Sequence, residues 1–306
     1  MNEKESIPVK FNSLSDIHGV LGLPKPLHPL ISLIKPSDND GELRPPKGSH
    51  IMNFYKISFS ADSAARVKYG QHYYDFNDGG MVFAAPNQVI GDDVNYTNTV
   101  SDFVLLFHPD FLLGYPLSKQ IKQYGYFSYS VNEALHLSVK EKEIILSVFK
   151  IIEEELNSRI DEFSQDVVIA QIDLLLNYAN RFYKRQFITR QTASNNILDK
   201  LEEILDNYLS KEKPLHLGIP TVQYLSEQLY ITPSYLSDML RSLIGQNAQQ
   251  YIQYKLIEKA KEKLSTTNLS VSEIAFDLGF QHSQSFSKLF KHKTNKTPLE
   301  FRNSFN

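Results

Sequence analysis

From Leu225 to the end of the chain, apolar and polar positions follow one helical pattern twice. The apolar residues Leu225, Leu229 and Ile231 recur 49 positions later, and the pattern of residues 236–251 recurs 50 positions later in residues 286–301. An internal repeat of this kind indicates two copies of one supersecondary unit. Each copy predicts a helix, a tight turn and a second helix.

Cap and turn residues set the ends of these helices. Ser270 and Glu273 form a predicted capping box that begins a helix, and Gly279 ends this helix as a left-handed cap. In the first copy, Thr232 precedes Pro233, so we expect Thr232 to cap the second helix. The buried stripe of the second helix in the second copy is predicted at Phe286, Leu289 and Phe290.

Both copies also end alike. Asn247 and Thr297 are each followed three positions later by Gln or Glu, which predicts the start of a third helix in each copy. Just before them stand Gly245 and Asn295, two residue types that tolerate a left-handed backbone. Residues 249–264 are predicted to form one helix of about 24 Å that joins the copies. This length is compatible with two helices in successive major grooves, roughly 34 Å apart.

The run from Ser272 to Phe280, its continuation through residues 286–291 and the closing segment 297–302 resemble the signature of the AraC/XylS family of bacterial transcription regulators. With the first copy, the resemblance covers residues 193–306. The sequence departs from the family pattern at three positions, where the family usually has Ala, Ser and Gly. These positions are Ser226, Gln284 and Asn295.

The resemblance implies a double helix-turn-helix domain that binds the major groove of double-stranded DNA. It also implies a cupin-like barrel before this domain, a small-molecule effector in that barrel, an extended arm over the pocket, and a homodimer. RNA polymerase is a candidate protein partner. The expected fold is therefore α+β, with a cupin-like β-barrel and a helical hairpin followed by an all-α domain.

Charge is unevenly distributed along the chain. The whole chain has a net charge of −3, and residues 1–190 contain 19 Lys+Arg against 23 Asp+Glu, whereas residues 240–302 contain ten basic and five acidic side chains. A local basic patch suffices for phosphate binding, although a solvated lysine face is the alternative for each residue. The phosphate candidates are Arg241, Lys288, Lys291, Lys293, Lys296 and Arg302.

In a helix-turn-helix, the early outward residues of the second helix face the base edges. Counted away from the apolar positions, these residues are Ser234, Ser237 and Asp238 in the first copy and Gln284, Ser287 and Lys288 in the second. Gln suits adenine and Lys suits guanine, whereas Asp accepts only from cytosine and is repelled by phosphate. We therefore expect the second copy to discriminate between base sequences better than the first copy does.

Strand-like patterns precede the helical repeat. Residues 51–59 alternate, and residues 81–85 and 103–107 are short apolar runs bounded by turn residues. Two long helices are predicted next, at residues 140–157 and 165–183. They either cover the barrel and contact a second subunit, or form a hairpin that is buried within one subunit. Residues 185–196 are polar, which places the domain boundary between a domain of residues 1–190 and one of residues 191–306.

A barrel of this kind can hold a small ligand among aromatic walls. The proline-rich segment 23–30 is a candidate lid, and core packing is the alternative explanation for each aromatic residue. The candidate effector-pocket residues are His28, Tyr55, Phe59, Tyr74 and Phe83. The cupin metal ligands require a His-x-His pair, which the nine histidines do not form, so we expect no metal, no cofactor and no catalytic residues.

Composition narrows the remaining alternatives. The chain has no cysteine, no secretory segment and no apolar run long enough to cross a membrane, so a cytoplasmic protein is expected. The leading hypothesis is a ligand-responsive transcription regulator that is not an enzyme. The alternative is a non-metal cupin that binds a small molecule and whose helical tail recruits a protein partner. A regulator that dimerises without sensing any ligand is a third hypothesis.

Overall fold

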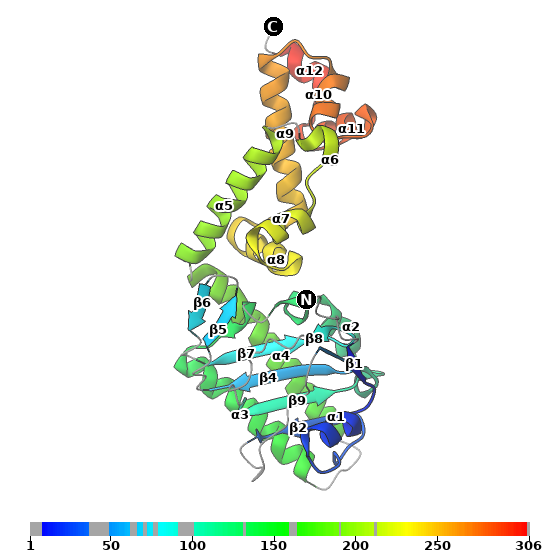
Figure 1. The fold of residues 1–306 in the computed structure, drawn as a ribbon, viewed down its shortest axis with the longest axis vertical. Coiled ribbons are helices and arrows are strands. Elements are labelled where there is room, and N and C mark those ends of the chain that lie inside the picture. Colours follow the sequence, from blue (N-terminus) through cyan, green and yellow to red (C-terminus); the bar gives the residue numbers. More distant parts are fainter. Residues whose placement is uncertain are drawn as a thin grey trace, which may run out of the picture. The chain divides into compact units, whose positions relative to one another are not determined.

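A computed structural model describes residues 8–36, 49–61, 66–69, 72–75, 79–90, 101–130, 133–158, 164–189, 191–210 and 213–304. Its contacts divide the chain into two compact units, residues 1–186 and 187–306. The first unit combines sheets and helices, and the second consists of helices (Figure 1). The chain is therefore of the α+β class.

The centre of the first unit is a five-stranded antiparallel sheet in the order β10-β7-β4-β9-β2. In β4, Ile57 pairs with Phe83 of β7 and with Leu105 of β9. The predicted apolar runs at 81–85 and 103–107 correspond to β7 and β9. The strands are β2 (Ile31–Ile34), β4 (Tyr55–Ser60), β7 (Gly80–Ala84), β9 (Phe103–Phe107) and β10 (Leu135–His136).

The predicted strand at 51–59 is wrong in one respect, because the chain bends at Asn53 and Phe54. Before the bend, β3 (His50–Met52) pairs in parallel with β1 (Val9–Phe11) and antiparallel with β8 (Val89–Ile90). After the bend, β4 belongs to the five-stranded sheet. The amide of Asn53 donates to the carbonyl of Phe11 at 3.2 Å, which holds the corner between the two sheets.

A third pair of strands, β5 (Arg66–Tyr69) and β6 (His72–Asp75), forms an antiparallel hairpin. Among the described strands, no strand order returns to its own beginning, so each sheet has open edges. The closed cupin-like barrel therefore stays a prediction.

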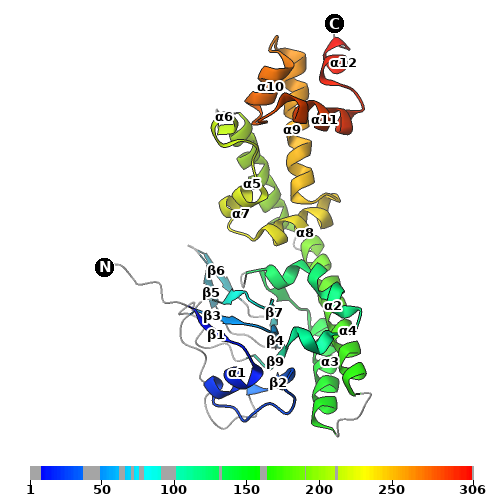
Figure 2. The same ribbon diagram turned by 90° about the vertical axis from the view of Figure 1, so that its right-hand side faces the viewer.

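The two faces of the five-stranded sheet have different covers (Figure 2). On one face lie α3 (Val139–Asn157) and α4 (Ser164–Thr189), close to the predicted helical hairpin, and Phe149 of α3 stacks on Phe59 and Phe103 at 5.7 and 5.2 Å between ring centroids. Between β9 and α3 lie η2 (Pro109–Leu112), α2 (Leu117–Gln120), η3 (Ile121–Gln123) and η4 (Gly125–Ser128).

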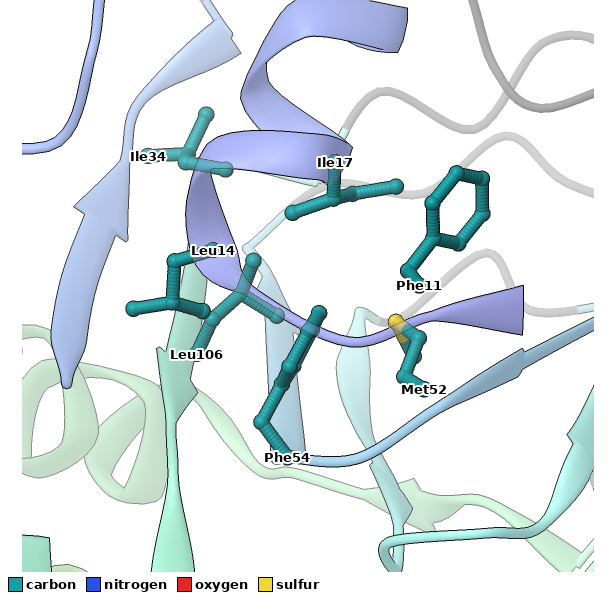
Figure 3. Packing of buried hydrophobic residues seen from close by; sticks show 7 residues of the cluster. All are labelled: Phe11, Leu14, Ile17, Ile34, Met52, Phe54 and Leu106. Atoms are coloured by element: carbon teal, nitrogen blue, oxygen red, sulfur yellow. The ribbon is translucent and has the colours of Figure 1, made fainter. Parts of the chain in front are cut away.

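The other face is covered by α1 (Leu14–Leu21) together with β1 and β3. Seven residues of these elements, of β2, of β9 and of the bend before β4 form one buried cluster (Figure 3). They are Phe11, Leu14, Ile17, Ile34, Met52, Phe54 and Leu106. Buried His18 of α1 contacts Ser32 Oγ at 2.9 Å and the Pro24 carbonyl at 2.6 Å, which fastens α1 and the proline-rich segment over this face.

The second unit is built around α9 (Ala248–Thr266), whose apolar stripe is buried. The polar segment 185–196, in which the domain boundary was predicted, is helical on both sides of residue 190, because α4 continues to Thr189 and α5 begins at Gln191. The other helices are α5 (Gln191–Leu209), α6 (Lys213–Leu217), α7 (Val222–Leu229), α8 (Pro233–Ile244), α10 (Val271–Asp277), α11 (Ser283–Thr294) and α12 (Pro298–Asn303). In the part of the chain that the structure describes, no helix has the length and hydropathy to cross a bilayer.

Candidate nucleic-acid interface

The first repeat copy consists of α7, a turn and α8. Thr232 caps α8 as predicted, because its hydroxyl accepts the amide of Tyr235 at 3.2 Å. The turn contains Tyr230, whose φ of 57° lies in the left-handed region and whose side chain is exposed. The buried side of α8 consists of Leu236, Met239 and Leu240. The remaining side chains of α8 are half-buried or exposed.

The second copy consists of α10, a turn and α11. The predicted capping box is confirmed, with Ser270 and Glu273 each accepting the other's amide. Gly279 has a φ of 88°, and the amide of buried Phe280 then donates to the carbonyl of Ala275 at 2.9 Å. In α11, Phe286 and Phe290 are buried, so the predicted stripe packs into the unit.

Both copies are attached to α9 at its two ends. The capping boxes at Asn247 and Thr297 are confirmed, and so are the left-handed residues Gly245 and Asn295 before them. At 19 residues, α9 is somewhat longer than predicted and measures about 28 Å. It therefore acts as a rigid spacer between α8 and α11.

A close backbone contact also positions the second copy. A Cβ on Gly279 would lie 2.5 Å from the carbonyl carbon of Gly218 and 2.8 Å from the amide nitrogen of Ile219. The Gly218 carbonyl oxygen in turn accepts the hydroxyl of Tyr208 of α5 at 3.0 Å. The turn of the second copy is therefore packed against the chain between α6 and α7.

Most basic side chains of α8 and α9 already have an acidic partner. Lys255 pairs with Glu202 at 2.9 Å, and Tyr251 also donates its hydroxyl to this carboxylate, so hydrogen bonds from Tyr251 and Lys255 lower the pKa of Glu202. The remaining pairs are Arg241–Asp238, Lys259–Glu262, Lys261–Glu258 and Lys263–Asp277. These partners offset much of the positive charge that the sequence places in this region.

The lysines of α11 and the turn after it differ from those of α9. Lys288, Lys291, Lys293 and Lys296 are exposed, and none of them forms an ion pair within the described residues. No acidic residue occurs between Asp277 and Glu300 in the sequence. Lys291 and Lys296 lie near the Glu300 carboxylate and contribute to its lowered pKa, after the larger effect of its hydrogen bonds to Thr297. The free positive charge is thus concentrated on the second copy.

The predicted base-contacting residues lie on the outer sides of α8 and α11. Gln284 and Lys288 are exposed near the start of α11, and Ser287 is half-buried. In α8, Ser234, Ser237 and Asp238 are half-buried. A 2.5 Å contact ties Asp238 to Arg241, so the first copy presents a neutral ion pair where the second presents lysines.

Arg302 has a structural environment. Its guanidinium donates to the carbonyls of Leu264, at the end of α9, and Leu269, at 3.3 and 2.6 Å. These bonds fasten α12 to the loop between α9 and α10. Pro298, four positions earlier on α12, is buried, so Arg302 lies on the same side of this helix as a buried residue.

Three of the five candidate effector-pocket residues lie on one face of the sheet. Tyr55, Phe59 and Phe83 are buried on the sheet face toward α3 and α4, where Phe83 packs on Tyr126 with centroids 4.6 Å apart. His28 packs edge-on against Phe111 at 5.5 Å, and burial lowers its pKa. These four residues thus pack within the fold, while the side chain of Tyr74 lies outside the described residues. Among the described side chains, no group of three His, Cys, Asp or Glu could hold a metal ion.

Comparisons with known proteins match parts of the chain. A family model described as a helix-turn-helix domain matches residues 225–304. The "Uncharacterized HTH-type transcriptional regulator YijO" of Escherichia coli K12 is 29% identical over 115 residues, which are 38% of this chain and 39% of that protein. The regulator SAS0078 of Staphylococcus aureus is 29% identical over 139 residues, 45% of this chain and 17% of that protein. The chain therefore spans well under two thirds of these relatives.

Similar solved structures also cover about a third of the chain. The C-terminal domain of the response regulator yesN from Fusobacterium nucleatum is 32% identical, covers 35% of this chain and 98% of that one, and has a TM-score of 0.31. The DNA-binding domain of AdpA, solved in complex with a target DNA, is 24% identical, covers 34% of this chain and 91% of that one, and has a TM-score of 0.30.

Proposed function

We propose that this chain, whose C-terminal unit is an AraC-type helix-turn-helix domain, is a sequence-specific transcriptional regulator that binds double-stranded DNA. The observation that carries the proposal is the exposed lysine surface of α11, whose cations have no ion-pair partner within the described residues. Such cations attract phosphate, while side chains early in the same helix contact base edges.

The two copies have unequal roles in this proposal. In the second copy, Gln284 and Lys288 contact base edges, with Ser287 beside them, and Lys291 and Lys293 contact phosphates. In the first copy, Ser234 and Ser237 contact bases, and Arg241 reaches phosphate only when it leaves Asp238. We do not assign Arg302 to DNA, because its guanidinium holds two backbone carbonyls.

Fluorescence anisotropy of the full-length protein on DNA from upstream of its own gene tests this proposal. Each phosphate contact removed by a Lys-to-Met change lowers the salt slope of log K by about 0.9. We expect this reduction for Lys291→Met and Lys293→Met but not for Lys259→Met, the matched control whose lysine pairs with Glu262 at 2.8 Å. Equal slopes for all three variants, or no preference over random DNA, would contradict the proposal.

Asp238 offers a second test with the opposite sign. Asp238→Asn removes the partner of Arg241 and a negative charge that faces DNA. Because an exposed pair contributes up to about 1 kcal/mol, the affinity should rise up to about fivefold at low salt. Weaker binding by this variant would mean that Asp238 itself accepts from a base, as its chemistry toward cytosine allows.

Homodimerisation and control by a small molecule are further parts of the proposal. Val167 and Leu174 of α4 are exposed seven positions apart, and Ile151 of α3 is also exposed, which supports α3 and α4 as the contact between subunits. Leu174→Glu should convert the dimer to a monomer in sedimentation velocity, and an unchanged sedimentation coefficient would rule out this surface.

Effector binding belongs to the first unit, for which we keep the cupin-like barrel as the proposed fold. A protein partner such as RNA polymerase would bind this chain after the chain has bound DNA.

A further inference from the structure

The central strand β4 separates two kinds of side chains. Tyr55, Ile57 and Phe59 are buried on the face toward α3 and α4. The alternate residues Lys56 and Ser58 lie on the opposite face, because successive side chains of a strand point to opposite sides. Leu106, the cross-strand partner of Lys56, belongs to the cluster formed with α1, β1 and β3 (Figure 3). This face is therefore only partly covered, because Lys56, Val82 and Val104 on it are half-buried.

Lys56 is in an unusual position for a lysine. Its strand lies between β7 and β9 in the middle of the sheet, its side chain is half-buried, and burial lowers its pKa. No carboxylate pairs with it among the described residues, whereas Lys35 of the same unit pairs with Glu153 at 3.0 Å. Removing an ammonium from water costs several kcal/mol unless an anion compensates. An anion beside Lys56 would therefore stabilise its charged form.

The neighbours of Lys56 indicate the chemistry of that partner. Ser58, two positions along the same face, is buried and supplies a hydroxyl group. The cross-strand partners of these two residues are apolar, with Ala84 and Leu106 beside Lys56, and Val82 and Val104 beside Ser58. One cation and one hydroxyl within an apolar surface suit a single carboxylate on an apolar body, since a phosphate would leave more charge without partners.

We propose that this face of the sheet binds a small amphipathic carboxylate, with Lys56 and Ser58 holding the carboxylate and the apolar neighbours contacting the rest of the molecule. The inference rests on the proposed regulation by a small molecule and gives that effector a chemical class. It also places the site on the opposite face from Tyr55, Phe59 and Phe83, which pack against α3, η4 and α4.

The test measures binding of octanoate and benzoate to the full-length protein by calorimetry and thermal shift, with 1-octanol as the uncharged control. Lys56→Met keeps the length of the side chain and removes its charge. Lys10→Met on exposed β1 is the matched control. A charged hydrogen bond contributes about 1.5–3 kcal/mol, so we expect Lys56→Met to weaken carboxylate binding at least about tenfold while Lys10→Met does not.

The stability of the ligand-free variant supplies an independent readout. If Lys56 has no partner in the chain, Lys56→Met should leave the melting temperature unchanged or raise it. A lower melting temperature would show that a carboxylate of the chain already pairs with Lys56, and this result would overturn the proposal. Absence of carboxylate binding, equal binding by 1-octanol, or unchanged binding by Lys56→Met would also overturn it.

DNA binding measured without ligand separates this inference from the proposed function. If the wild-type protein binds its upstream DNA but no carboxylate, only the ligand inference fails. If carboxylates bind through Lys56 and the protein shows no preference for any DNA, the regulator proposal fails and the ligand site remains.

Discussion

Replacing Gly279 with Ala tests how firmly the second helix-turn-helix is held. Gly279 has a φ of 88°, and an added Cβ would lie 2.5 Å from the carbonyl carbon and 2.8 Å from the oxygen of Gly218. Both are backbone atoms, so no flexible side chain can turn away. Gly245 provides the control, since its φ is 72° but a Cβ there would meet nothing within 4 Å.

The expected cost has two parts. An L-residue in the left-handed region costs roughly 1–2 kcal/mol, and this applies to both variants. Overpacking against fixed atoms adds about 1–3 kcal/mol, and this applies to Gly279→Ala alone. We therefore expect a loss of about 1–2 kcal/mol for Gly245→Ala and about 2–5 kcal/mol for Gly279→Ala. The difference between the variants measures the contact with Gly218.

Urea unfolding followed by circular dichroism gives the overall loss of stability. Hydrogen exchange of peptides from α10 and α11 locates it, because each 1.4 kcal/mol lost locally accelerates exchange about tenfold. The reasoning is refuted if Gly279→Ala costs no more than Gly245→Ala, or if faster exchange is absent from α10 and α11. Because α11 carries the proposed DNA surface, Gly279→Ala should also weaken DNA binding.

Three further predictions concern the second unit. Tyr230→Gly removes a backbone strain of about 1–3 kcal/mol, because glycine adopts the left-handed conformation freely, but it costs about 0.5–1 kcal/mol in conformational entropy of the unfolded chain. Urea unfolding should therefore show equal or higher stability. Arg302→Met should lower stability by about 1–3 kcal/mol and leave the salt slope of DNA binding unchanged, whereas Lys293→Met should do the reverse. The hydrogen bond from Tyr251 lowers the pKa of Glu202, so the ionised carboxylate stabilises the fold above its ordinary pKa of 4.5, and this stabilisation is lost as the pH falls. Glu202→Gln should therefore make the free energy of urea unfolding depend less on pH between about 5 and 3.

Short-range chemistry explains why so much of the second unit was predictable. A cap such as Thr297 acts on an amide three residues away, and a left-handed Asn295 or Gly245 needs only its own backbone. Neither depends on which other element lies nearby. The sequence therefore sufficed to predict where these helices start and end. The internal repeat sufficed to predict the same order of helices in both copies.

Packing between distant segments explains what was missed. Alternation in β4 predicts two faces but not which layer covers each, so the sequence did not show that Tyr55 packs on η4 and Phe59 on α3. The bend at Asn53 depends on a bond to Phe11, more than 40 residues away. The sequence also could not show that Arg302 binds two backbone carbonyls, because these carbonyls lie on other segments.

The difference between the two copies follows from the same physics. Positions that face α9 must be apolar in both copies, because burial stabilises them whatever the unit binds. Positions on the outer sides of α8 and α11 contribute little to folding, so they can diverge to Asp238 and Arg241 in one copy and to Lys288 and Lys291 in the other. In the proposed function, base discrimination lies in those outer positions, and it depends equally on the DNA sequence that they contact.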